Sequence, residues 1–148
     1  MERPLYPAGP RPNGTRAAES EGELAFAHAP DRPTQGKLLD VEATLVIEAD
    51  TLTVPTRPLD DVLDDEPPPD VMKVDIEGAA ASALRGATRV LEEVGPPIYL
   101  ELHGPEEQAG VRDELLTRWY VAETLDGERV VDPTVGWHSP LWCHKPPA

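Results

Sequence analysis

The stretch Val71-Met72-Lys73-Val74-Asp75-Ile76-Glu77-Gly78 decides how this chain of 148 residues is expected to fold. Its short, continuous apolar run predicts a buried β-strand over residues 71–74, and two carboxylates and a glycine follow where a helical pattern begins. In an open α/β sheet, ligands bind outside the carboxyl ends of the strands, so Asp75 and Glu77 are expected to share one rim of the sheet. Gly78 allows the backbone to turn tightly into the helix.

An alternation of strand and helix continues after this stretch. Apolar residues recur at helical spacing over residues 78–93, and Gly95-Pro96-Pro97 ends the pattern as a helix stop does. Residues 98–102 predict a second strand, and a second helix is expected from Pro105 to about Arg118. This order with short connections favours an α/β fold with parallel strands and right-handed crossovers.

The segment before the quoted stretch carries weaker signals. Residues 43–56 alternate between apolar and polar side chains, which predicts a hairpin or two short strands with Ala49-Asp50 between them. Pro58 suits the first position of a short helix, and Pro67-Pro68-Pro69 stops that helix.

The C-terminal part is expected to add antiparallel strands. Asp126-Gly127 separates two strand-like runs, residues 120–125 and 128–131, and this dipeptide is a strong hairpin signal. Residues 141–145 are expected to form the final strand.

The N-terminal residues 1–40 are expected to be mostly disordered. They are rich in Pro, Gly, Ala, Glu and Arg and hold few large apolar side chains. Such a segment buries too little apolar surface to offset an ordering entropy of roughly 1–2 kcal/mol per residue. A short strand is predicted only at residues 23–26.

Composition restricts the partners of the chain. The net charge of −15 argues against nucleic acid and against an anionic membrane surface, because both are bound through Lys and Arg. Acid-rich, lysine-poor surfaces suit a cytoplasm of high salt, where charge repulsion is screened, so a halophilic source is a hypothesis. Cys143 is the only cysteine, and the chain holds neither an apolar run of membrane-spanning length nor a signal peptide, which predicts a soluble cytoplasmic protein.

Several ordered segments together resemble one family. They are Pro58-Leu59-Asp60-Asp61-Val62-Leu63, Pro69-Asp70, the quoted octapeptide, Ala83-Leu84-Arg85-Gly86-Ala87 and Pro97-Ile98-Tyr99-Leu100-Glu101-Leu102-His103. In this order they resemble the FkbM family of S-adenosylmethionine-dependent methyltransferases over roughly Thr53 to Tyr120. The chain departs from the family pattern at Pro58, where Thr is usual, and at Ala79-Ala80-Ala81, where Ala, Glu and a large residue are usual.

The resemblance implies a Rossmann-like class I methyltransferase sheet, of which residues 41–148 would form the C-terminal half. The implied strand order is the Val71 strand, the Ile98 strand, the last strand and the Tyr120 strand. The family's Gly-rich cofactor loop has no counterpart here, because residues 8–14 are flanked by prolines and by no apolar strand. The Val71 strand would then be an edge, covered either by residues 43–56 or by a protein partner that supplies the missing half-sheet.

Four residues are candidates for the site. Asp75 and Glu77 could cap the following helix, but the resemblance implies that they act at the acceptor side, where a carboxylate can remove a hydroxyl proton or bind a divalent cation that does so. Glu101 and His103 end the adjacent strand and alternate to the same side, so we expect them to bind the substrate. No residue is assigned as a metal ligand or as a cofactor ligand.

Three functions remain open at this point. The first is methyl transfer from S-adenosylmethionine to a hydroxyl group of a sugar or small metabolite, with weak or absent cofactor binding by this chain alone. The second is a non-catalytic remnant or subunit that docks on a partner through the exposed sheet edge. The third and weaker one is a hydrolase that uses the acidic residues to bind magnesium or manganese.

Overall fold

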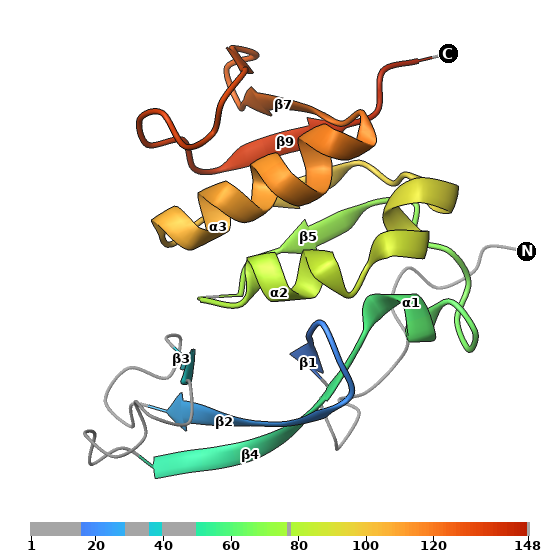
Figure 1. Cartoon of the computed structure of the whole chain (residues 1–148), viewed down its shortest axis with the longest axis vertical. Coiled ribbons are helices and arrows are strands. Elements are labelled where there is room, and N and C mark those ends of the chain that lie inside the picture. Colours follow the sequence, from blue (N-terminus) through green and yellow to red (C-terminus); the bar gives the residue numbers. More distant parts are fainter. Residues whose placement is uncertain (1–15, 29–35, 40–49, 77, 148) are drawn as a thin grey trace, which may run out of the picture.

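The computed structural model describes residues 16–28, 36–39, 50–76 and 78–147. These residues form two sheets that follow one another along the long axis of the molecule (Figure 1). The larger sheet has five strands, which in spatial order are β5 (Met72–Val74), β6 (Ile98–Leu100), β9 (Leu141–His144), β7 (Val121–Thr124) and β8 (Arg129–Val130).

The pairing within this sheet follows the expected order. β5 and β6 are parallel, as strands joined by a helical crossover must be, and the remaining neighbours are antiparallel. The last strand, β9, lies between β6 and β7, which confirms the predicted position. The predicted hairpin is also confirmed, since Asp126-Gly127 lies in the loop between β7 and β8 and Gly127 has a φ of 84°.

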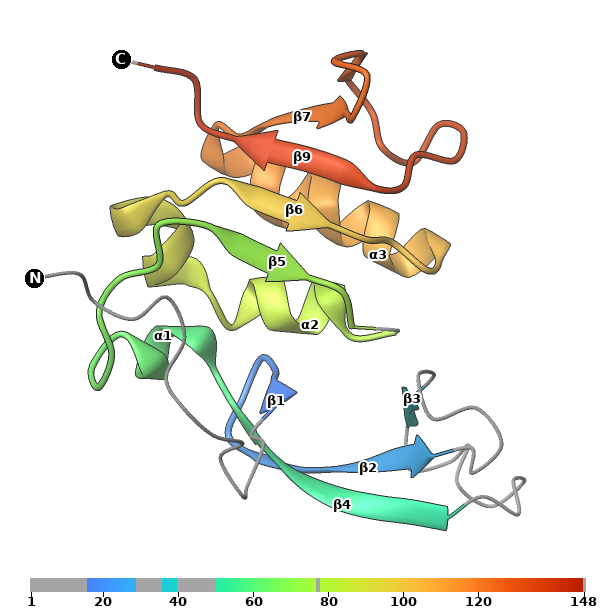
Figure 2. The same ribbon diagram turned by 180° about the vertical axis from the view of Figure 1, so that it is seen from behind.

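The helical segments occupy the connections before and between these strands. α1 (Leu59–Val62) precedes β5, α2 (Ala80–Arg85) and the π-type turn η2 (Val90–Val94) connect β5 to β6, and α3 (Pro105–Gly110), η3 (Val111–Leu115) and η4 (Leu116–Arg118) lead from β6 to β7. α2 and α3 cover one face of the five-stranded sheet (Figure 1). Figure 2 shows the opposite face, in front of which no helix of the described residues lies.

The helix boundaries agree in part with the sequence. The helix predicted over residues 78–93 is helical but interrupted after α2, whose C-cap is Gly86. η2 ends at Gly95, which has a left-handed φ of 64°, as the predicted stop requires. The second helix runs from Pro105 to Arg118 and is confirmed. Pro58 is the N-cap of α1 rather than its first residue.

The hydrophobic core lies between the helices and the sheet. Val74 and Leu100 point toward the helices and are buried, because successive strand residues face opposite sides. Lys73, Tyr99 and Trp142 stand in register across three strands on the open face. The helices bury their apolar side against the sheet through Ala80, Leu84, Ala87, Leu91, Val111 and Leu115.

A second sheet contains the N-terminal part of the chain. Its strands are, in spatial order, β1 (Arg16–Ala17), β4 (Asp50–Arg57), β2 (Gly22–His28) and β3 (Gly36–Leu39). The expected disorder of residues 1–40 is therefore wrong for residues 16–28 and 36–39, because β4 and its neighbours pair with them and satisfy their backbone groups. The short strand predicted at residues 23–26 is confirmed within β2.

The upstream hairpin prediction also needs correction. Asp50 begins the single strand β4, which runs to Arg57, instead of lying in a turn. The reason is long-range pairing: Asp50 through Thr56 align with β2, a partner that local alternation cannot reveal. Residues 43–49 lie outside the described part of the chain.

The small sheet lies beside α2 and does not extend the large sheet. The backbone amide of Glu19 donates to Ser82 Oγ at 3.1 Å, and Arg85 Nε lies 2.6 Å from a Glu19 carboxylate oxygen. β4 pairs with β1 and β2, and among the described residues β5 pairs with β6 alone. Of the two alternatives expected for the edge of the Val71 strand, cover by residues 43–56 does not take the form of strand pairing with Asp50–Thr56, which pair within the small sheet.

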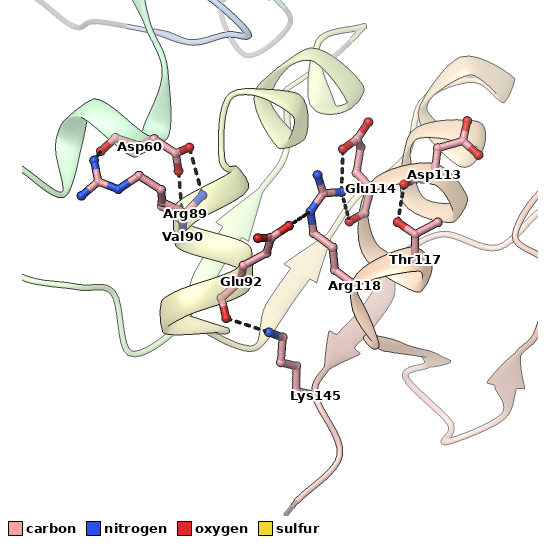
Figure 3. Close-up of polar contacts among 9 residues, drawn as sticks. All are labelled: Asp60, Arg89, Val90, Glu92, Asp113, Glu114, Thr117, Arg118 and Lys145. Carbon is pink, nitrogen blue, oxygen red and sulfur yellow. Dashed lines mark hydrogen bonds and ion pairs between the residues drawn. The ribbon is translucent and has the colours of Figure 1, made fainter.

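Polar contacts join the helical segments to one another (Figure 3). The two carboxylate oxygens of Asp60 in α1 accept the backbone amides of Arg89 and Val90, each at 3.0 Å, and so bind the start of η2. In η4, Arg118 contacts Glu92 of η2 at 3.2 Å. Its other contact is with Glu114, at 2.8 Å.

None of the helices in the described ranges has the length and apolar character needed to cross a lipid bilayer.

Candidate functional site

Polar side chains gather on the open face where β5 and β6 end. They are Lys73, Asp75, Tyr99, Glu101 and His103, which we call the rim cluster. Every second residue of each strand and of the short extended segment after it belongs to the cluster, while the residues between them are buried or half-buried toward the helices. Because the two strands are parallel, their carboxyl ends meet and bring Asp75 beside the residues that follow β6.

The rim cluster is held by short contacts. His103 Nε2 lies 3.1 Å from Asp75 Oδ1, and Lys73 Nζ lies 2.9 Å from Asp75 Oδ2. The same ammonium lies 3.7 Å from Glu101 Oε1, so it stands between the two carboxylates. The side chains of Asp75, Glu101 and His103 are about one-third exposed, at 35%, 34% and 32%. They are reachable from solvent yet partly ordered by one another.

Charge pairing sets the electrostatics of the cluster. The hydrogen bond from Lys73, followed by that from His103, holds the pKa of Asp75 below its ordinary value. The same hydrogen bond to Asp75 raises the pKa of Lys73. Partial burial and the neighbouring Glu101 carboxylate raise the pKa of Tyr99. At neutral pH the cluster therefore contains an ionised Asp75, a charged Lys73 and a protonated tyrosine hydroxyl.

Three of the four predicted site residues meet. Asp75, Glu101 and His103 converge as their strand positions predict, whereas Glu77 lies outside the described residues. Asp75 contacts Lys73 and His103, and the N-cap of α2 is Ala79, with no side-chain cap bond. Among the described residues, the structure therefore gives Asp75 contacts within the rim cluster and shows no helix-cap contact for it.

Two members of the rim cluster were missed by sequence reasoning. Lys73 stands two residues before Asp75, and Tyr99 stands two residues before Glu101. The period-two alternation of a strand is the signal that would have placed both on the same face.

Glu107 binds the backbone next to the rim cluster and was also missed by sequence reasoning. Its side chain is buried, and one carboxylate oxygen accepts the backbone amide of Ala80 at the start of α2 at 3.3 Å. The other oxygen accepts the backbone amide of His103. Glu107 is the third residue of α3, and an acidic side chain at this position often accepts a backbone amide just before the helix. The preceding Gly104-Pro105 marks the start of the helix in the sequence.

A surface pocket lies elsewhere on the molecule. It has a volume of about 300 Å³, and its lining includes Trp119, Arg129 and Val131 from the β7–β8 side of the sheet. None of the rim-cluster residues lines it. We take the rim cluster as the candidate site because it unites ionisable groups at the carboxyl ends of strands, where ligands of α/β sheets bind.

Comparison with known proteins identifies the family of the chain. Residues 13–126 match the family model of the methyltransferase FkbM domain. Since the match spans more than half of the chain, the protein belongs to the FkbM methyltransferase family, and the resemblance in the sequence is confirmed.

Among solved structures, the chain is similar to the methyltransferase FkbM from Methylobacillus flagellatus KT, with 23% identity and a TM-score of 0.45. The similarity covers 89% of this chain and 28% of that one, so the chain spans little more than a quarter of that protein's length. Comparison with curated proteins finds no significant match.

Proposed function

We propose that this chain forms the acceptor side of a cytoplasmic O-methyltransferase that transfers a methyl group from S-adenosylmethionine to a hydroxyl of a sugar or small metabolite. The observation that carries the proposal is the 3.1 Å contact between Asp75 Oδ1 and His103 Nε2 at the carboxyl ends of two parallel strands, in a chain of the FkbM family. Methyl transfer requires an acceptor oxygen held in line with the methyl carbon and a group that takes the hydroxyl proton.

The rim cluster offers groups for both tasks. The ionised Asp75 orients the imidazole of His103, and this pair receives the proton as the carbon–oxygen bond forms. Glu101 and Tyr99 stand beside the pair and offer hydrogen bonds to other hydroxyls of the acceptor. A polyhydroxylated acceptor fits such a cluster because it can bind several of these groups at once.

The cofactor site is proposed to lie outside these 148 residues. The sequence contains no Gly-rich segment between an apolar strand and a helix, which is where such a cofactor would be bound. We expect the chain alone to bind S-adenosylmethionine weakly or not at all. Calorimetry on the purified chain tests this, and micromolar binding would overturn it.

The catalytic proposal needs the cofactor-binding half in the assay. The chain is combined with the polypeptide segment that carries the Gly-rich loop, and transfer of labelled methyl groups to a panel of sugars is measured. Asp75→Asn and His103→Ala are each expected to lower transfer by about 100-fold or more, because proton removal by a positioned group contributes that much. His144→Ala, which changes a histidine on the same face near Glu123, is the control and is expected to retain transfer.

A second candidate function rests on the sheet edge. Among the described residues β5 pairs on one side only, and an edge strand exposes amides and carbonyls that another chain can bind. We propose that a protein partner that supplies the missing half-sheet docks on this edge. The resulting complex is either a complete methyltransferase or a non-catalytic assembly. Hydrogen exchange at residues 72–74 tests this, since protection should increase when the partner is added and stay unchanged if the partner binds elsewhere.

A further inference from the structure

We propose that Asp75, Glu101 and His103 form a binding site for a divalent transition-metal ion. One ligand atom from each of these side chains lies within 4.8 Å of the other two. Donors bound to one ion at about 2.0–2.2 Å stand roughly 3–3.5 Å apart. Asp75 Oδ1 and His103 Nε2 already satisfy this spacing at 3.1 Å, so only a small rotation of the partly exposed Glu101 side chain is needed.

The donor set indicates which ions fit. One imidazole nitrogen and two carboxylate oxygens suit Zn²⁺, Mn²⁺, Fe²⁺ or Co²⁺ better than Ca²⁺ or Mg²⁺, because hard cations prefer oxygen ligands alone. Three protein ligands leave at least one position open for water or for a substrate oxygen. The arrangement is therefore that of a site that can act on a ligand rather than that of a closed structural site.

A cation already occupies part of this space. Lys73 Nζ lies 2.9 Å from Asp75 and 3.7 Å from Glu101, so its ammonium compensates the two carboxylates in the protein without metal. The Lys73 side chain is 61% exposed and flexible, and it can swing into solvent when an ion enters. Lys73 and the metal ion therefore compete for the same carboxylates. Removing the Lys73 ammonium is expected to increase the affinity for the metal ion.

Metal binding and the metal-free proton transfer are alternatives, because His103 Nε2 is held by Asp75 Oδ1 in the metal-free site, which leaves Nδ1 to take the proton, whereas Nε2 would bind the ion in the metal site. With an ion bound, a hydroxyl on the open coordination position loses its proton more readily. This consequence rests on the proposed methyl transfer, whereas the binding itself does not. Metal binding in the absence of any methyl transfer would overturn only the proposed function.

The test is a titration of the tag-free chain with Co²⁺, followed by its visible absorption, together with calorimetry using Zn²⁺. One equivalent is expected to bind to the unaltered chain. His103→Ala and Glu101→Gln are each expected to weaken binding at least 10-fold, in line with the loss of one of three ligands. His144→Ala is the matched control, because His144 lies 3.6 Å from Glu123 on the same sheet face and the part of the chain that the structure describes adds no third ligand group there, so this variant should bind normally.

Lys73→Met provides the decisive variant, since a gain in affinity cannot come from misfolding. Removal of the competing ammonium is expected to tighten Co²⁺ and Zn²⁺ binding several-fold, and Lys145→Met should leave it unchanged. The inference is overturned if no saturable binding occurs at millimolar Zn²⁺. It is equally overturned if His103→Ala and Glu101→Gln bind as the unaltered chain does, or if Lys73→Met binds more weakly.

Discussion

The carboxylate of Glu107 joins three parts of the molecule at the scale of one residue. It is 3% exposed and accepts backbone amides from Ala80 in α2 and from His103 ahead of α3. Glu107→Gln keeps the shape of the side chain but leaves only one oxygen to accept the two backbone amides. The second oxygen is replaced by an NH2 group, which cannot accept a hydrogen bond. We expect a loss of unfolding free energy of about 1–3 kcal/mol, measured by urea denaturation.

The neighbouring acid supplies the control for this prediction. Glu106→Gln makes the same chemical change one residue earlier on an exposed position of α3, and its effect is expected to stay within about 0.5 kcal/mol. Equal effects of the two substitutions would mean that Glu107 contributes through its charge at the helix start and not through its two buried hydrogen bonds.

Cys143 predicts how stability depends on alkaline pH. Burial raises the pKa of its thiol from 9.0 to about 12. Between these values the unfolded chain loses the proton and the folded chain keeps it, so the folded state is destabilised as pH rises and keeps its full stability below pH 9. The loss reaches about 1.4 kcal/mol per pH unit for one such group.

Cys143→Ala tests this cause. The variant is expected to be less stable at pH 8, because it leaves a small cavity, but to lose less stability than the unaltered chain between pH 9 and 11. Burial, followed by the nearby Cys143, also raises the pKa of Tyr120 to about 12, and only the part caused by burial remains in the variant. If the urea denaturation midpoints of the unaltered chain and of Cys143→Ala fall by the same amount between pH 9 and 11, Cys143 is not the cause of the loss of stability.

At the scale of elements, the crossing of α2 and α3 depends on a missing side chain. A Cβ at Gly110 would lie 2.6 Å from Ala81 Cβ and 2.9 Å from Ala81 Cα. Gly110→Ala is therefore expected to cost about 1–3 kcal/mol of stability through overpacking. Gly104→Ala is the control, because a Cβ there meets nothing within 4 Å.

In the double variant Gly110→Ala with Ala81→Gly, the methyl group removed at position 81 makes room for the one added at position 110. Ala81→Gly alone should cost about 1 kcal/mol, since glycine is a poor helix former. The double variant is expected to lose less than the sum of the two single losses, with a coupling of at least about 0.5 kcal/mol in thermal or urea denaturation. Strict additivity would show that the two helices can move apart at no cost.

At the scale of the whole molecule, the net charge of −15 predicts a dependence on salt. Repulsion among acidic side chains destabilises the compact state, and raising KCl shortens the screening length from about 10 Å at 0.1 M to about 3 Å at 1 M. The melting temperature is therefore expected to rise with KCl. A fall toward molar KCl would contradict both this prediction and the hypothesis of a halophilic source.

A variant of lower charge separates repulsion from general salt effects. Asp126→Asn with Glu128→Gln removes two exposed charges from the β7–β8 loop. This variant is expected to gain less in melting temperature from KCl than the unaltered chain does. An identical gain would mean that KCl acts through something other than the repulsion of surface acids.

Local patterns predicted much of the large sheet because its elements are short and each carries its own signal. The Asp126-Gly127 turn, the Gly95 stop and the Pro105 start all reflect backbone preferences that act within a few residues. The pairing and extent of the small sheet escaped prediction, although a strand at residues 23–26 was expected, because β2 and β4 stabilise each other across a long sequence separation. Low apolar content alone therefore suggested disorder where pairing supplies the structure.

The sequence by itself determined the family, the strand ends that carry Asp75, Glu101 and His103, and the apolar faces that build the core. These features depend on residue type and on spacing along one segment. Only the tertiary structure decided that Lys73 stands between the two carboxylates, that Glu107 binds the backbone of His103, and that the small sheet lies beside α2. Each of these contacts joins side chains or backbone groups on different elements, and their distances depend on how the strands and helices pack together.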